Sequence, residues 1–370
     1  MNEEIPTDPA LAARLHREAV VIDGLNASHF QSPVVLERLL AGGVTAVNIT
    51  VAAWHGQVKT MCQIGEMYEI LERHSDRVMA IGTASDIARA KATGRVGVIL
   101  GFQGTDPIEE DIRMLAVYRA IGVRIMQLTY NLTNRVGSGY RVPEDSGLTP
   151  FGRRVVAEMN RLGILIDLSH CGDRTTREGI ETSERPVAIT HANSRRFCDS
   201  RRNKSPEVLK LLAERGGMIG AMNFPTVLTG DKHATLDDYI HAIEDLIEIV
   251  GVDHVGLGPD FMELMPREVL TEALTGFSDE TINRFFGAPP TLGFESIALL
   301  PNVTGALLAR GHREEDVRKI LGGNWLRFYE QAWEAQAPAR EALPRIAATG
   351  FGRRRTDPDY RPFRAETLPS

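Results

Sequence analysis

The strongest constraint on the fold is an alternation of eight short apolar segments with longer amphipathic ones. The apolar segments occupy residues 19–23, 45–51, 96–102, 123–129, 162–168, 187–190, 217–222 and 254–258. The segments between them have helical spacing and occupy residues 33–41, 61–74, 109–120, 150–162, 174–183, 206–214 and 236–250. Strands that are almost wholly apolar are typical of parallel sheets covered by helices. The alternation therefore predicts an α/β fold, a (β/α)8 barrel of TIM type.

A doubly wound open sheet is the alternative α/β architecture. Its dinucleotide-binding form carries Gly-x-Gly-x-x-Gly after a strand, and no predicted strand is followed by that motif. Extra C-terminal helices are expected at 303–311 and 314–321, and a turn at 322–325 starts a last helix. We predict a single domain over residues 1–350 and an extended C-terminal tail over residues 351–370.

Composition narrows the partners and the compartment. The chain has 370 residues, 43% of them hydrophobic, which is ample for a large core. Its net charge of −7 argues against nucleic acid as a partner. The three cysteines form no Cys-x-x-Cys pair and fit a reducing compartment. Without a signal-peptide-like or membrane-spanning run, we expect a cytoplasmic protein that acts on a small molecule and binds no membrane.

Two histidines follow neighbouring predicted strands. His170 comes two residues after the fifth apolar segment, and His191 comes directly after the sixth. In a parallel barrel, the carboxyl ends of the strands share one rim, so both imidazoles should lie there. Neutral imidazoles are common ligands of divalent metals. Two hydrogen-bonded core histidines are the alternative, but their matched positions favour a metal site.

Other polar residues are expected on the same rim. Asp260 is the candidate general base, with a helix-capping or turn role as the alternative. Arg202 is a candidate ligand of a substrate carboxylate, with a solvated basic turn equally possible. Tyr130 is a candidate hydrogen-bond donor to an oxyanion or a half-buried core aromatic. Asn131, beside it, is a candidate substrate contact, and Gln103 follows the third predicted strand.

Five short motifs resemble those of one family. They are Asp-Leu-Ser-His at 167–170, His-Ala-Asn-Ser-Arg at 191–195, Cys-Asp-Ser-Arg-Arg-Asn at 198–203, Gly-Pro-Asp-Phe at 258–261 and Gly-Asn-Trp at 323–325. Their order and spacing resemble the membrane (renal) dipeptidases over residues 20–333. The resemblance implies an amidohydrolase-type (β/α)8 barrel that holds two zinc ions and cleaves dipeptides with a free carboxylate. It also implies a homodimer.

The chain departs from this family pattern at one metal site. Leu25 and Ala27 stand where the family has a His-x-Asp pair, and Gln103 stands where it has a bridging glutamate. Tyr130 replaces a histidine that polarises the substrate carbonyl. The resemblance therefore implies that one metal site is lost and the other is retained.

We therefore predict a divergent hydrolase that cleaves an amide or related C–N bond in a small carboxylated substrate. One divalent metal, zinc, would be bound by His170 and His191, with the amide oxygen of Gln103 as a weak third ligand. Asp260 would move the proton, and a second metal site is expected to be absent. The alternatives are a metal-independent lyase, isomerase or decarboxylase, and a non-catalytic binding protein.

Overall fold

The computed structural model describes residues 8–230, 233–273, 277–280, 282–283 and 289–334. All of them belong to one compact unit, Met1–Ala335. The predicted tail at 351–370 and the last part of the predicted domain 1–350 lie outside the described residues. Among the helices that are described, none is both long and apolar enough to cross a lipid bilayer.

Eight parallel strands form a closed barrel, which confirms the predicted (β/α)8 fold. Each strand pairs with the next, and the last pairs with the first. A ninth strand, β3, pairs beside the start of β4 and was not predicted. The strands are β1 (Ile22–Asn26), β2 (Ala46–Ala52), β3 (Val78–Ala80), β4 (Val96–Phe102), β5 (Val123–Gln127), β6 (Leu165–Asp167), β7 (Ala188–Ile189), β8 (Met218–Ala221) and β9 (Val255–Leu257).

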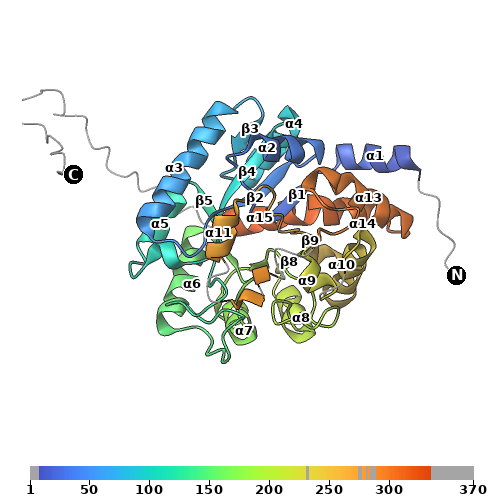
Figure 1. Ribbon diagram of the computed structural model, residues 1–370. Helices are drawn as coiled ribbons and strands as arrows, with labels where there is room; N and C mark the ends of the chain where they lie inside the picture. The colour runs from blue at the N-terminus through green and yellow to red at the C-terminus, as the bar shows by residue number, and fades with distance from the viewer. Residues whose placement is uncertain (1–7, 231–232, 274–276, 281, 284–288, 335–370) are drawn as a thin grey trace, which may run out of the picture. The chain divides into compact units, whose positions relative to one another are not determined.

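Helices surround the strands, and further helices come after the last strand in the sequence (Figure 1). They are α1 (Pro9–Glu18), α2 (Pro33–Ala41), α3 (Gln57–Arg73), α4 (Ala84–Thr93), α5 (Met114–Ala120), α6 (Pro150–Leu162), α7 (Asp173–Thr182), α8 (Pro206–Glu214), α9 (Pro225–Leu228), α10 (Leu236–Val250), α11 (Arg267–Ala273), α13 (Leu300–Ala309), α14 (Glu314–Arg318) and α15 (Asn324–Glu334). Helices α2, α6, α8 and α10 have the predicted bounds. Residues that favour helix starts explain this agreement. Proline stands in the first turn of α2, α6 and α8, and a serine or threonine hydroxyl accepts a hydrogen bond from the first turn of α6, α8 and α10.

Two predicted helices differ from the structure. The helix predicted at 109–120 begins only at Met114, because Glu109 has a φ of +50°, which a right-handed helix cannot contain. The helix predicted at 314–321 ends at Arg318 and continues as a π-helical turn, Lys319–Gly323. The unpredicted α4 begins at Thr83 with a capping box in which Asp86 takes part.

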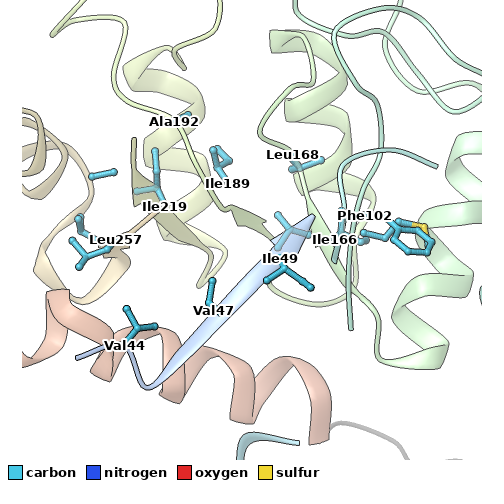
Figure 2. Packing of buried hydrophobic residues seen from close by; sticks show 14 of the residues in the cluster. Val44, Val47, Ile49, Phe102, Ile166, Leu168, Ile189, Ala192, Ile219 and Leu257 are labelled. Atoms are coloured by element: carbon cyan, nitrogen blue, oxygen red, sulfur yellow. The ribbon is translucent and has the colours of Figure 1, made fainter. Parts of the chain in front are cut away.

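The outward faces of the strands pack against the surrounding helices. The buried side chains between strands and helices form a large apolar cluster, in which Val47 and Ile49 of β2 are fully buried. Ala46 of the same strand belongs to a second apolar cluster. This alternation is expected because successive side chains of a strand point to opposite faces. Figure 2 shows Val47 and Ile49 in the cluster with residues of other strands, including Ile166 and Ile189.

A separate apolar cluster closes the N-terminal end of the barrel. It contains one residue from each of eight strands together with the aromatic face of α15. Trp325 of α15 is fully buried and donates a hydrogen bond from Nε1 to the carbonyl of Leu257, at 2.9 Å. Gly256 permits this approach, because a Cβ there would lie 2.4 Å from Trp325 Nε1. The strand residues are Ile22, Ala46, Met79, Ile99, Ile125, Leu165, Ala188 and Met218.

A substitution at Trp325 tests how much the fold depends on the apolar cluster that contains it. We expect Trp325→Ala to lower the free energy of unfolding by about 3–5 kcal/mol, because it opens a large cavity. Val58→Ala, at a side chain 81% exposed on α3, should change it by less than about 0.5 kcal/mol. Urea unfolding followed by circular dichroism measures both. Equal losses in the two variants would contradict the assigned role of α15.

Candidate functional site

A cavity of 130 Å³ lies at the carboxyl ends of the strands. Four of the predicted site residues line it, each just after a different strand: Gln103, Tyr130, His170 and Asp260. The rest of the lining comes from the end of β2, from the loops after β1 and β2, from α3, and from α11 and the segment that leads into it. The complete lining comprises Ala27, Thr50, Val51, Ala52, Ala53, Trp54, His55, Gln63, Gln103, Tyr130, His170, Asp260, Met262, Met265, Val269 and Leu270.

A larger, open hollow of 740 Å³ shares only Trp54 with this cavity. Acidic side chains of the loop that follows β4 line it, including Glu109 and Glu110. None of the predicted site residues lies among its lining residues. The smaller cavity is therefore the place where the predicted chemistry can occur.

The two predicted histidines meet at the end of β6 and β7. His170 Nε2 lies 3.0 Å from His191 Nε2, and both rings are buried. The opposite nitrogen of each ring has its own partner, Asn131 Oδ1 at 2.7 Å for His170 and Thr190 Oγ1 at 2.8 Å for His191. Thr190 in turn donates to the buried carboxylate of Asp167, at 2.8 Å. These outer contacts fix the orientation of both imidazoles.

Both imidazoles are neutral at pH 7. Burial, reinforced by the positive charge of Arg202, holds the pKa of His170 and that of His191 well below their usual range. Because an amide oxygen only accepts, His170 donates from Nδ1 to Asn131, and its Nε2 carries a lone pair. In the tautomer of His191 that donates from Nδ1 to Thr190, both Nε2 lone pairs face the same point.

This arrangement fits one divalent metal. Zinc–nitrogen bonds of about 2.0–2.1 Å in tetrahedral geometry place two ligand nitrogens about 3.3 Å apart, close to the observed 3.0 Å. Gln103 donates from Nε2 to Thr50 Oγ1 at 2.8 Å, which leaves its Oε1 as the amide ligand atom. Within the described ranges, no three His, Cys, Asp or Glu side chains cluster closely enough to hold an ion. Leu25 and Ala27, at the positions of the other site, provide no ligand atom.

Asp260 is held in a strained backbone conformation at the cavity. Its φ is +60°, which is uncommon for a residue other than glycine, and its amide donates to the carbonyl of Leu25 at 3.1 Å. Burial raises the pKa of its carboxyl to about 7, and Arg202 offsets part of the rise. A carboxyl of this kind both accepts and returns a proton near neutral pH.

Tyr130 stacks on His170, one of the two predicted metal ligands. Its ring centroid lies 4.5 Å from that of His170, with an interplanar angle of 27°. Burial raises the pKa of the Tyr130 hydroxyl, which therefore stays protonated and able to donate at neutral pH. Asn131, predicted as a substrate contact, is only 6% exposed and has a φ of +58°. It is not among the cavity-lining residues. Its observed contact orients His170.

Arg202 lies deeper than expected. It is only 4% exposed, and it donates from Nη1 to the carbonyl of Ser169 at 2.7 Å and from Nη2 to that of His191 at 2.8 Å. The alternative of a solvated basic turn is wrong for Arg202, because its loop turns inward and ties the ends of β6 and β7 together. Its neighbour Arg201 is exposed.

Sequence reasoning missed the loop after β2. His55 lines the cavity with a side chain 9% exposed, and neither of its ring nitrogens has a hydrogen-bond partner. Glu272 of α11 lies 3.6 Å from its Nε2, just beyond hydrogen-bond distance. The signal was present, because His55 follows the second predicted strand closely, as His170 and His191 follow theirs.

Comparison with known proteins agrees with this geometry. A family model described as membrane dipeptidase (peptidase family M19) matches residues 8–288. The chain belongs to this family. Dipeptidase tcpJ of Claviceps purpurea is 28% identical over 297 residues, which cover 79% of this chain and 64% of that protein. The chain thus spans less than two thirds of the length of that relative.

Two solved structures support the same family fold. An amidohydrolase from Pseudomonas aeruginosa is 36% identical, with a TM-score of 0.81 over 87% of this chain and 99% of that one. A metallo peptidase from Rhodobacter sphaeroides, liganded with a phosphinate mimic of the dipeptide L-Ala-D-Ala, is 23% identical. Its TM-score is 0.73 over 85% of this M19 chain and 100% of the other, and it supports the fold alone.

The two adjacent arginines provide a matched test of the buried contacts. We expect Arg202→Lys to lower the free energy of unfolding by about 2 kcal/mol, because one ammonium cannot replace the fork that serves two buried carbonyls. Arg201→Lys should change it by less than about 0.5 kcal/mol. Urea unfolding of both variants decides the matter. Equal stabilities would show that the Arg202 contacts contribute nothing.

The raised pKa of Asp260 predicts a stability that depends on pH. Since the folded-state pKa of about 7 lies above the unfolded value, the contribution of the carboxyl is fully present below about pH 4 and is lost as the pH rises through 7. Asp260→Asn removes this loss, and asparagine tolerates a positive φ. We expect the variant to be more stable than the wild type at pH 8, by at most about 4 kcal/mol, and nearly equal to it at pH 4.

A second aspartate provides the control for this pH series. Asp111 is paired with Arg113, whose hydrogen bonds lower the pKa of the Asp111 carboxyl to about 2. Its stabilising effect is present above the unfolded pKa and is lost as the pH falls, so Asp111→Asn should show the opposite sign. Chemical unfolding in EDTA at several pH values measures both variants. A pH-independent difference for Asp260→Asn would contradict the raised pKa.

Proposed function

We propose that this M19 family member hydrolyses an amide or related C–N bond in a small carboxylated substrate with one divalent metal, zinc. The observation that supports it most directly is the pair of neutral imidazoles, with Nε2 atoms 3.0 Å apart, beside a cavity that also contains Asp260. A bound metal would polarise the scissile carbonyl and lower the pKa of a water molecule. Two apolar residues at the other ligand positions, Leu25 and Ala27, favour a single metal over two.

The chain's own groups divide the remaining tasks. Asp260 takes a proton from the attacking water and delivers it to the leaving nitrogen, a role that its pKa of about 7 suits. Tyr130, protonated at neutral pH, donates a hydrogen bond to the developing oxyanion. His170 and His191 remain neutral and are oriented by Asn131 and Thr190.

Arg202 supports a carboxylated substrate through its charge. Its two hydrogen bonds go to neutral carbonyls, and no carboxylate of the described residues lies within ion-pair distance of its guanidinium. A buried cation without an ion-pair partner favours an anion nearby. The substrate carboxylate would supply that charge on the His170 side of the cavity.

Metal content and hydrolysis together test the proposal. We expect plasma emission analysis to find at most one zinc per chain. EDTA and His170→Ala should each abolish hydrolysis across a panel of dipeptides, N-acyl amino acids and lactams. With one metal fewer than the two-zinc members, cleavage of ordinary L,L-dipeptides should stay below about 10 per second. His16→Gln is the matched control, because His16 is buried against Thr304 and Gly42 and should leave metal binding unchanged.

Three outcomes would overturn the proposal. Two metals per chain would mean that other side chains complete a second site. Turnover that survives chelation would indicate acid–base chemistry without metal. No turnover on any compound of the panel, with metal present, would favour a binding protein.

A further inference from the structure

The lining of the cavity includes two chemically different sets of side chains. Thr50, Gln103, Tyr130, His170 and Asp260 carry hydroxyl, amide, imidazole and carboxyl groups and belong to strand ends or to the residues that follow them. A second set has aliphatic and thioether side chains, and most of its members belong to residues 262–270. We call this second set the apolar wall, and its members are Val51, Met262, Met265, Val269 and Leu270.

Most of the apolar wall is incompletely buried in the protein alone. Val269 is 39% exposed, and Met262, Met265 and Leu270 are partly exposed, whereas Val51 is buried. Apolar surface that still meets water gains free energy when a ligand covers it. Methionine adapts its shape to different partners, so the two methionines fit side chains of more than one shape.

The position of α11 relative to the site is fixed by polar contacts. Glu272 of α11 accepts a hydrogen bond from Trp54 Nε1 at 3.2 Å and contacts Lys59 Nζ at 3.4 Å. Trp54 lies in the loop after β2, and its ring centroid is 5.2 Å from that of Tyr130. The helix that carries Val269 and Leu270 is thus tied to the loop after β2, whose Trp54 also packs against Tyr130.

Charge and size further restrict the group that the apolar wall accepts. Within the described ranges, no lysine or arginine lines the cavity. Arg202 lies beside His170, where it donates to the carbonyl of Ser169, so an acidic side chain at the apolar wall would find no cation close to it. A lysine side chain would have to lose its hydration against aliphatic carbon. The cavity volume of 130 Å³ lies below the roughly 300–1,000 Å³ of typical ligand pockets and suits a small substrate.

We propose that the substrate carries an uncharged aliphatic side chain that packs against the apolar wall, while its scissile bond and carboxylate face the polar residues at the strand ends. This inference rests on the proposed function and names its substrate class. Leu270, on α11, contacts the substrate side chain and determines specificity without taking part in bond cleavage.

Binding of inhibitors tests this without requiring turnover. The probes are four phosphinate pseudo-dipeptides that differ in one side chain, glycine-, leucine-, aspartate- or lysine-like, titrated calorimetrically into the full chain with one equivalent of zinc. We expect the leucine-like compound to bind about 10-fold or more tightly than the glycine-like one, since a buried apolar group discriminates by this factor. The two charged compounds should gain nothing over the glycine-like one.

Variants of the wall and of its surroundings sharpen the test. Leu270→Ala should reduce the leucine-to-glycine preference to about 2-fold or less and leave the affinity for the glycine-like compound unchanged. Leu270→Met, which conserves volume, should retain the preference. The control is Leu264→Ala, because Leu264 lies in the same segment, is 47% exposed and does not line the cavity.

The outcomes separate this inference from the proposed function. Equal binding of all four compounds, binding of none, or a preference that survives Leu270→Ala would overturn the assignment of the apolar wall. Hydrolysis that requires metal but shows no such preference would leave the proposed function standing alone. A preference for the leucine-like probe in a protein without hydrolytic activity would support the wall and refute the reaction.

Discussion

One buried carboxylate, Asp167, connects the two strand ends that carry the histidines. It accepts hydrogen bonds from the amide and hydroxyl of Ser169 and from the amide and hydroxyl of Thr190. Ser169 immediately precedes His170, and Thr190 immediately precedes His191. The four contacts therefore set the distance between the imidazoles. Burial raises the pKa of this carboxyl, and the hydrogen bonds oppose that rise.

Arg202 complements this arrangement from the same loops. It holds the carbonyls of Ser169 and His191, whereas Asp167 holds the hydroxyls and amides. The backbone on both sides of the histidines is thus satisfied by charged groups of opposite sign. Charged hydrogen bonds are stronger than neutral ones, and buried backbone groups without partners are costly. Burial and the positive charge of Arg202 keep both imidazoles neutral.

Much of the barrel could be predicted because its signals are local. The strands are largely apolar, and four helices with clear N-terminal signals begin and end where their sequence indicates. Strand β3 is only three residues long, too short to show a period, and α4 is alanine-rich with a weak apolar stripe. The meeting of His170 and His191 could be predicted from the parallel topology, since equivalent strand ends share one rim.

How deeply a loop side chain is buried cannot be predicted from its neighbours in the sequence. Nothing in the sequence distinguishes the buried Arg202 from the exposed Arg201, because the turn of their loop depends on contacts with β6 and β7. The lining of the cavity by Met265 and Leu270 depends on a chain segment that returns across the rim, which no periodicity indicates. His55 was within reach of the same reasoning that found His170, but its strand end was not considered.

The aromatic cluster around Trp325 limits how small molecules can reach and leave the interior of the barrel. With one end of the barrel sealed, reactant, product and solvent must all share a single mouth at the other end. Departure of a product and arrival of the next reactant then compete for the same passage. The residues that border this opening, including those of the segment 262–270, therefore affect the release of product as well as the binding of substrate.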